Sequence, residues 1–276
     1  MSFTQSLISA VALATFANSR AVKFGVLTDI HLNPEYQPNL DVGRTFCGPG
    51  PQAQVSEQIA NFGRPGCDSP KLLVETMMKQ MKAEHPDLEV ILVPGDIVTH
   101  AFPSDKPETN QTVTDSYQNI LGVLDEVADL FETHFDSVIV LPTIGNNDTQ
   151  YHYNPAEGAN KKSYYERLVS DWFTGHTGNK QLENMSDIKS TMAQGGWYRV
   201  DIPGADLSVI SLNTLLYNSK LWEEETNEQS DQLEWLEKQL EEATDGHKFI
   251  LLSHIYETAS YYGTANDNWK TNDGFQ

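Results

Sequence analysis

The feature that most constrains the fold is a series of short apolar runs, rich in β-branched residues, that recur between segments of helical periodicity. Runs of this length and composition predict buried strands. The predicted strands are Val22–Leu27, Val90–Val93, Val138–Leu141, Leu207–Leu212 and Phe249–Leu252. Strands that alternate with helices favour an α/β fold, and neither a repeat nor an obvious linker interrupts the 276 residues. We therefore expect one layered α/β domain.

Three of the intervening segments have the apolar spacing of amphipathic helices. Ser69 is expected to cap the first helix, with Pro70 as its first residue, and Ser230 is expected to cap the third. The residues expected to face the core are Leu73, Met77 and Met81 in the first helix, Tyr117, Ile120, Leu121, Leu124, Val127 and Phe131 in the second, and Leu233, Leu236 and Leu240 in the third. These faces predict helices packed against the strands.

Polar side chains directly follow four of the predicted strands. Because ligands in open α/β sheets bind beyond the carboxyl ends of the strands, these side chains are expected to converge. They are Asp29 and His31, then Asp96 and His100, then Asn146, Asn147 and Asp148, and finally His254. Carboxylate, imidazole and amide groups suit Zn, Mn or Fe. The pattern predicts a hydrolytic metal centre.

Each of these polar residues, taken alone, also has a purely structural interpretation. An aspartate after a strand is often a helix cap, Asn146 beside Gly145 could be a turn residue, and an isolated histidine is more often hydrogen-bonded than a ligand. Four independent structural roles at four strand ends would be a coincidence, whereas one metal site explains all four at once.

Four sequence blocks resemble, in order and approximate spacing, the motifs of calcineurin-like metallophosphoesterases. They are Asp29-Ile-His31, Gly95-Asp96-Ile-Val-Thr-His100, Gly145-Asn146-Asn147-Asp148 and Ser253-His254. The likeness is to the acid sphingomyelinase-like phosphodiesterase branch, which further segments also resemble. These segments are Cys67-Asp68-Ser69-Pro70, Gly195-Gly196-Trp197-Tyr198, Ile210-Ser211-Leu212-Asn213-Thr214 and Gln232-Leu233-Glu234-Trp235-Leu236. The resemblance implies an α/β sandwich of two mixed β-sheets flanked by helices.

The resemblance also implies two divalent ions, zinc in the first place, with manganese or iron as alternatives. Asp96 would bridge the ions, Asp29 and His31 would bind one of them, and Asn146 and His254 the other. Two ions roughly 3.5–4 Å apart can share a bridging hydroxide that attacks phosphorus in line. The implied reaction is hydrolysis of a phosphodiester or pyrophosphate bond.

The resemblance implies two catalytic positions, Asn147 and His100. Asn147 stands where many relatives carry a histidine, and an amide cannot transfer a proton as an imidazole does. His100, four residues after Asp96, is therefore the candidate that protonates or orients the leaving oxygen. The Gly-Asn-Asn-Asp form of this block resembles endopolyphosphatases, which makes polyphosphate an alternative substrate.

The Gly-His-x-His block of the family has no counterpart between His254 and Gln276. Since that block supplies one imidazole to each ion, the remaining donors give about three contacts per ion. We expect residues 20–276 to be a catalytic domain truncated before this block, with the C-terminal part of the fold missing. A catalytically dead exported protein that binds a partner is the alternative.

Three features indicate export to a secreted or lysosomal location. Residues 1–19 contain an apolar stretch typical of a signal peptide, although no basic residue precedes it and a buried helix is the alternative. Cys47 and Cys67 lie in a Gly- and Pro-rich segment where a disulfide would form in an oxidising compartment; two free thiols are the alternative. Asn110 and Asn184 begin glycosylation sequons, a pattern that also arises by chance.

The net charge of the chain argues against two classes of binding partner. A formal net charge of −21 repels phosphate backbones and anionic membranes, which argues against a nucleic-acid scaffold. No apolar run reaches the roughly 18–20 residues of a transmembrane helix. We expect a metal-dependent phosphodiesterase for a small-molecule or lipid-headgroup substrate of the nucleotide or sphingomyelin type. The oligomeric state stays open.

Overall fold

The computed structural model describes residues 20–41, 47–49, 53–104, 112–218 and 227–256. Within these ranges the chain forms two three-stranded sheets and a short two-stranded pair. The first sheet consists of the parallel strands β1 (Phe24–Val26), β4 (Val90–Val93) and β5 (Ile139–Pro142). The second consists of β6 (Tyr198–Asp201), β7 (Leu207–Ser211) and β8 (Lys248–Leu252), and the pair of β2 (Leu40–Asp41) and β3 (Gln54–Val55).

The first sheet owes its parallel order to the helices between its strands. Helix α1 (Lys71–Glu84) lies between β1 and β4 in the chain, and α2 (Thr112–Phe135) lies between β4 and β5. Such crossovers return the chain to the same end of the sheet, so that all three strands run in one direction. Every residue of β4 and β5 is buried, which explains why both strands are uninterrupted apolar runs.

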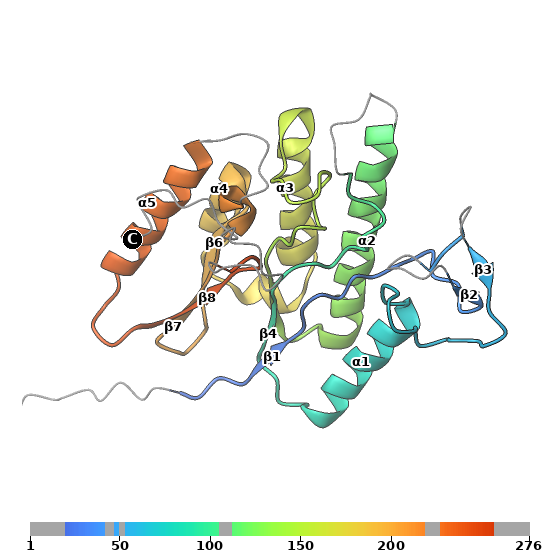
Figure 1. Ribbon diagram of the computed structural model, residues 1–276. Coiled ribbons are helices and arrows are strands. Elements are labelled where there is room, and N and C mark those ends of the chain that lie inside the picture. The colour runs from blue at the N-terminus through green and yellow to red at the C-terminus, as the bar shows by residue number, and fades with distance from the viewer. Residues whose placement is uncertain (1–19, 42–46, 50–52, 105–111, 219–226, 257–276) are drawn as a thin grey trace, which may run out of the picture.

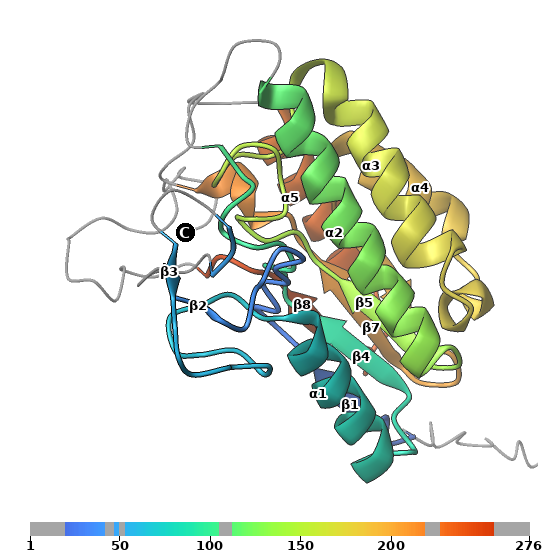
Figure 2. The same ribbon diagram turned by 90° about the vertical axis from the view of Figure 1, so that its right-hand side faces the viewer.

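The second sheet is mixed, because β6 is antiparallel to β7 while β8 is parallel to it. Helix α4 (Met185–Gly195) contacts β6, and α5 (Asn227–Glu241) packs against α4. Figure 1 shows α5 at the left and α1 and α2 at the right, and Figure 2 shows α2, α3 (Lys161–Val169) and α4 side by side. In the described residues, short helical turns also form at η1 (Gly158–Asn160), η2 (Ser170–Thr174), η3 (Gly178–Gln181) and η4 (Thr214–Tyr217).

A single hydrophobic core includes residues from both three-stranded sheets and from the helices that cover them. The expected α/β class is therefore confirmed, and each predicted strand is present, with Val90–Val93 at its predicted bounds and the others shifted by at most two residues. Strand β6 and helix α4 were not expected. Among the helices that the structure describes, none is long and apolar enough to cross a bilayer.

The expected buried face of α1 is wrong at Leu73 and Met77, whereas Met81 packs against the core as expected. Val74 and Met78 are the buried residues, whereas Leu73 and Met77 are each 37% exposed. The N-cap is Pro70 rather than Ser69. Adjacent apolar residues give this helix two neighbouring stripes, and periodicity cannot choose between them. Packing against the sheet makes the choice.

The α2 face is confirmed, since its expected residues are buried or pack against the core. The expected start of α5 is wrong, because the helix begins at Asn227 and Ser230 lies in its first turn. Leu240 is 43% exposed, and the buried residues are Gln229 and Gln232. Both glutamines hydrogen-bond the segment around η4, so amide contacts, as well as leucine packing, position this helix.

Candidate metal centre

The loops that follow β1 and β4 have an unusual backbone at the expected site residues. Asp29, His31 and Asp96 have positive φ angles of 53°, 41° and 55°. This conformation costs on the order of 1–3 kcal/mol per residue and persists where the surroundings enforce it. Here the loops lie side by side: the Asp29 N–H donates to the Gly95 carbonyl at 3.1 Å, and the His31 N–H to the Asp96 carbonyl at 3.0 Å. The backbone thus brings these side chains together.

The loops after β4 and β5 approach each other at two glycines. A Cβ on Gly145 would lie 2.0 Å from the Asp96 nitrogen, and one on Gly95 would lie 2.7 Å from the Gly145 nitrogen. Only glycine permits this approach. The buried carboxylate of Asp148 then joins the loops, because it accepts N–H bonds of 2.7–2.9 Å from Gly145, Asp96 and the two residues after Asp96.

The carboxylate of Asp96 lies at the centre of the cluster and is 4% exposed. His31 Nε2 lies 3.4 Å from its Oδ2, and His254 Nε2 lies 3.3 Å from its Oδ1. Asn147 donates to the same two oxygens from its backbone N–H at 2.9 Å and its side-chain amide at 2.8 Å. The Asn146 side-chain oxygen lies 2.9 Å from His254 Nε2. Two imidazoles therefore face opposite oxygens of one carboxylate.

The other nitrogen of each imidazole is held by the backbone. His31 Nδ1 lies 2.9 Å from the Val98 carbonyl oxygen, and His254 Nδ1 lies 2.8 Å from the Pro94 carbonyl oxygen. Since a carbonyl only accepts, each Nδ1 carries a hydrogen. In the neutral rings Nε2 would then present a lone pair to a carboxylate oxygen of Asp96, a contact that calls for a cation or a proton. Histidines that bind metals are anchored in this way.

The same contacts shift the pKa values of the cluster. Burial lowers the pKa of His254, but the hydrogen bond and the charge of Asp96 outweigh it and raise this pKa to about 9. Burial raises the pKa of Asp96, but the hydrogen bond of His254 and the charges of His254 and His31 outweigh it and lower this pKa to about 2. A metal ion must therefore displace a proton from His254 to bind there.

Two overlapping sets of donor atoms share Asp96, and a further group that could hold an ion, formed by His31, Asp68 and His100, meets the first set at His31. The first set comprises Asp29, His31 and Asp96, whose donor atoms lie within 4.8 Å of one another. The second set shares Asp96 and adds Asn146 and His254, in direct contact with each other. Because Asp29 is 55% exposed and His254 only 11%, the first set is the more open to solvent. Hard oxygen and borderline nitrogen donors suit divalent Zn, Mn or Fe.

His100 lies beside the first donor set. Its ring stacks on that of His31, with centroids 4.1 Å apart and planes inclined by 23°. His100 Nδ1 lies 2.9 Å from Asp68 Oδ1, and this hydrogen bond raises the pKa of His100 although burial opposes it. Asp68 is the residue that the sequence analysis omitted from the site. Its signal was its place in the Cys67-Asp68-Ser69-Pro70 block.

The comparison with known families bears directly on this cluster. Residues 22–273 match the calcineurin-like phosphoesterases. This chain belongs to the calcineurin-like phosphoesterase family. The expected resemblance is thereby confirmed, and the cluster around Asp96 is built from the blocks that carry it.

Two curated relatives of this calcineurin-like phosphoesterase have the names that its motifs suggest. The acid sphingomyelinase-like phosphodiesterase 3b of Homo sapiens is 24% identical over 264 residues, which cover 94% of this chain and 53% of the relative. An endopolyphosphatase of Neurospora crassa is 25% identical over 267 residues, which cover 88% of this chain and 33% of the relative. The chain thus spans about half the length of the human relative, or less in the fungal case. Among solved structures, the purple acid phosphatase PPD1 of yellow lupin (Lupinus luteus) has a TM-score of 0.43 at 14% identity, covering 92% of this chain and 34% of that chain.

The remaining expected residues of the phosphoesterase lie outside the cluster. Cys47 and Cys67 form a disulfide with their Cα atoms 5.5 Å apart, which confirms the expected pairing. Asn184 is half-buried, and its side-chain amide donates to the Arg199 carbonyl at 2.7 Å. Glycosylation at Asn184 stays a prediction. Asn110 and the proposed signal peptide, residues 1–19, lie outside the described residues.

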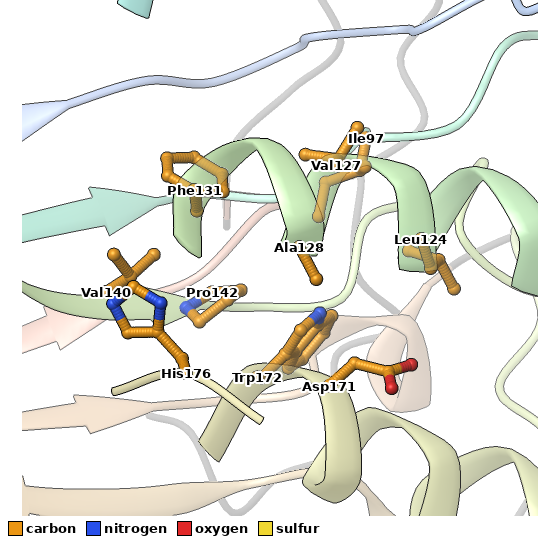
Figure 3. Close-up of a pocket in the computed structure, with 10 residues that line it drawn as sticks. All are labelled: Ile97, Leu124, Val127, Ala128, Phe131, Val140, Pro142, Asp171, Trp172 and His176. Atoms are coloured by element: carbon orange, nitrogen blue, oxygen red, sulfur yellow. The ribbon is translucent and has the colours of Figure 1, made fainter. Parts of the chain in front are cut away.

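A separate cavity of the phosphoesterase lies between α2, β5 and η2 (Figure 3). Its volume of about 10 Å³ has room for roughly one water molecule. Figure 3 shows Asp171, Trp172 and His176 opposite the α2 side chains Leu124, Val127, Ala128 and Phe131. Because its lining is mostly apolar and its volume so small, this cavity is a packing gap rather than a substrate site.

Proposed function

We propose that this chain is a hydrolase that holds two divalent metal ions and cleaves phosphodiester or pyrophosphate bonds of small nucleotide or sphingomyelin-type substrates. Asp29 and His31 would bind one ion, Asn146 and His254 the other, and Asp96 both. Bound there, the ions would neutralise the phosphate oxygens and lower the pKa of the attacking water. The observation that carries the proposal is the pair of backbone-anchored imidazoles that face opposite oxygens of Asp96.

His100 and Asn147 have different roles in the proposed reaction. His100 lies next to the first donor set with a side chain 38% exposed, so it can reach a bound ester and protonate its leaving oxygen. Asn147 is 1% exposed, and its side-chain nitrogen is bonded to Asp96. Its amide therefore orients the bridging carboxylate and transfers no proton. The buried side-chain oxygen of Asn147, which has no hydrogen-bond partner in the described residues, is left to contact a ligand.

The test is hydrolysis of bis(p-nitrophenyl) phosphate by protein treated with a chelator, before and after addition of Zn, Mn or Fe. We expect turnover only with added metal, and a His254→Ala variant should lose at least about 10²-fold in kcat because a ligand is missing. His85→Ala, at an exposed position at the end of α1, is the matched control. A folded, metal-loaded chain with no turnover above His254→Ala would contradict the proposal and favour the catalytically dead binding protein.

A second candidate function is endopolyphosphatase activity. The Gly-Asn-Asn-Asp block favours it, because Asn147 replaces the imidazole that many family members carry and because a relative with this name matches the chain. Release of phosphocholine from sphingomyelin, compared with shortening of long-chain polyphosphate, distinguishes the two. Shortening of polyphosphate without phosphocholine release would move the assignment to the second candidate.

We also propose that the protein is exported, to a secreted or lysosomal location. The Cys47–Cys67 disulfide supports this, because such bonds persist in oxidising compartments. Thiol labelling of the natural protein under nonreducing conditions tests it, and both cysteines should resist the reagent. Free labelling of both would contradict export.

A further inference from the structure

The carboxylate of Asp68 makes three contacts with the segment that carries His100. Its Oδ2 accepts a bond from the Thr99 hydroxyl at 2.5 Å and one from the backbone N–H of His100 at 2.8 Å. Its Oδ1 lies 2.9 Å from His100 Nδ1. Asp68 is 5% exposed, so these bonds are shielded from water. One buried carboxylate therefore holds both the backbone and the ring of His100.

The position of Asp68 is itself fixed from both sides. The preceding residue, Cys67, is tied to Cys47 by the disulfide. The following residue, Ser69, donates its N–H to the His31 carbonyl at 3.0 Å and accepts from the Asn33 N–H at 2.9 Å. The same short segment thus contacts the backbone of a candidate metal ligand and the side chain of His100.

These contacts define the orientation of the His100 ring. A carboxylate at Nδ1 keeps a hydrogen on that nitrogen, so Nε2 lies on the opposite edge of the ring, directed away from Asp68. Stacking on His31 fixes the plane of the ring. Since the His100 side chain is 38% exposed while Asp68 is buried, the exposed edge of the ring is the one free to meet a substrate.

We propose that Asp68 is a positioning residue, which holds the His100 ring so that its Nε2 hydrogen reaches the leaving oxygen of a bound phosphodiester. The proposal rests on the proposed function. In the step, the attacking water releases one proton to solvent and its oxygen forms a new bond to phosphorus, while the bond between phosphorus and the ester oxygen breaks and that oxygen keeps the electron pair. It takes the Nε2 hydrogen of the doubly protonated His100 ring, which becomes neutral, keeps its Nδ1 hydrogen bonded to Asp68, and regains a proton at Nε2 from solvent.

The variant Asp68→Asn separates positioning from folding. The asparagine amide has one oxygen that accepts and one nitrogen that only donates. If the oxygen accepts from the backbone N–H of His100, the amide nitrogen faces His100 Nδ1 and donates a hydrogen to it. The ring hydrogen must then leave Nδ1. Thr99→Val is the matched control, because it removes the third bond to the same carboxylate while the two bonds to His100 remain.

The kinetic test compares a dialkyl phosphodiester with its analogue in which sulfur replaces the leaving oxygen, since a thiolate leaves without being protonated. Asp68→Asn and His100→Asn should each lower kcat for the oxygen ester by about 10²-fold, and the double variant should be no slower than either. Turnover of the sulfur analogue should stay within a few-fold. Thr99→Val should leave the ratio of the two substrates unchanged. Equal losses on both substrates, or multiplicative losses in the double variant, would overturn the proposal.

A measurement that needs no turnover distinguishes this proposal from the proposed function. In ¹⁵N-histidine-labelled protein without added metal, with His100→Asn used for assignment, the ring hydrogen of neutral His100 should sit on Nδ1 and move to Nε2 in Asp68→Asn. An unchanged tautomer in Asp68→Asn would overturn the positioning role, whatever the activity. If the wild-type protein cleaves neither substrate but the ring hydrogen of His100 still moves from Nδ1 to Nε2 in Asp68→Asn, the proposed function fails and the positioning of His100 by Asp68 stands.

Discussion

Asp148 illustrates how a single side chain can organise a site without taking part in its chemistry. It accepts four backbone N–H bonds from the loops after β4 and β5 and is fully buried. Burial and the charge of Asp96 raise the pKa of Asp148 to about 6, although the backbone N–H groups oppose this shift. The carboxylate is thus ionised at neutral pH, where its charge strengthens all four bonds.

Replacing Asp148 with alanine should lower the free energy of unfolding by about 3–5 kcal/mol, because it leaves buried N–H groups without acceptors. Urea denaturation at pH 7 measures this loss. Asp231→Ala, on the exposed side of α5, should stay within about 0.5 kcal/mol of the wild type. A loss below about 1 kcal/mol for Asp148→Ala would show that water replaces the carboxylate.

Asp171 makes stability depend on pH in an unusual direction. Burial and a hydrogen bond shared with Asp125 raise its pKa to about 7, against the pull of Arg167. The folded state therefore binds more protons than the unfolded state between about pH 4 and pH 7, so this group's contribution to stability falls as pH rises through that window. Asp171→Asn should remove the dependence and stabilise the protein at pH 8 by on the order of 1 kcal/mol, after allowance for partial solvation.

Thermal unfolding of Asp171→Asn and of the wild type at pH 5 and pH 8 tests whether the contribution of Asp171 to stability falls as pH rises. The Asp171→Asn protein should have a higher Tm than the wild type at pH 8, and the difference should shrink at pH 5, where Asp171 is protonated in the folded state. A destabilised Asp171→Asn protein at pH 8 would mean that the ion pair with Arg167, whose nitrogen lies 2.9 Å from the carboxylate, outweighs burial.

At the scale of elements, the site depends on how closely the ends of β4 and β5 approach. Gly145→Ala would place a methyl group 2.0 Å from the Asp96 nitrogen, so the loops must separate. We expect a loss of a few kcal/mol in the free energy of unfolding and a loss of metal-dependent turnover.

Gly122→Ala is the matched control for this change. Gly122 lies within α2, and a Cβ there meets nothing within 4 Å. Alanine should stabilise the helix by roughly 0.5–1 kcal/mol. Urea denaturation of both variants provides the comparison, and a Gly145→Ala protein as stable as Gly122→Ala would disprove the close approach of the loops.

At the scale of the whole molecule, the net charge of −21 should oppose the approach of a polyanionic substrate under the proposed function. A long polyphosphate is repelled at low ionic strength, whereas a zwitterionic headgroup is not. Raising the salt from about 10 mM to about 150 mM shortens the Debye length from roughly 30 Å to 8 Å. The KM for polyphosphate should then fall several-fold, and the KM for a zwitterionic diester should change little. A KM for polyphosphate that rises with salt would indicate a local cationic path to the site.

The fold could be predicted best where every residue of an element is both apolar and buried. Strands β4 and β5 are buried on both faces, so they appear as plain apolar runs. The face of α1 could not be predicted, because two adjacent apolar stripes satisfy the helical period equally well. The buried Gln229 and Gln232 of α5 could not be predicted either, because only their tertiary partners make amide burial favourable.

At the candidate metal centre, too, some residues could be predicted from the sequence and others only from the tertiary structure. Asp29, Asp96 and Asn146 follow β1, β4 and β5, which are parallel strands of one sheet and end at a common edge, so their convergence follows from local pattern and sheet direction. His254 follows β8 of the second sheet, and it meets Asp96 only because the two sheets pack together. Asp68 follows no strand and comes from a loop held by a disulfide. Its contact with His100 spans 32 positions along the chain and depends on how two loops pack. Residue type and strand order could thus be read from the sequence, whereas bond partners across loops were settled by packing, because hydrogen bonding depends on distances that no local pattern contains.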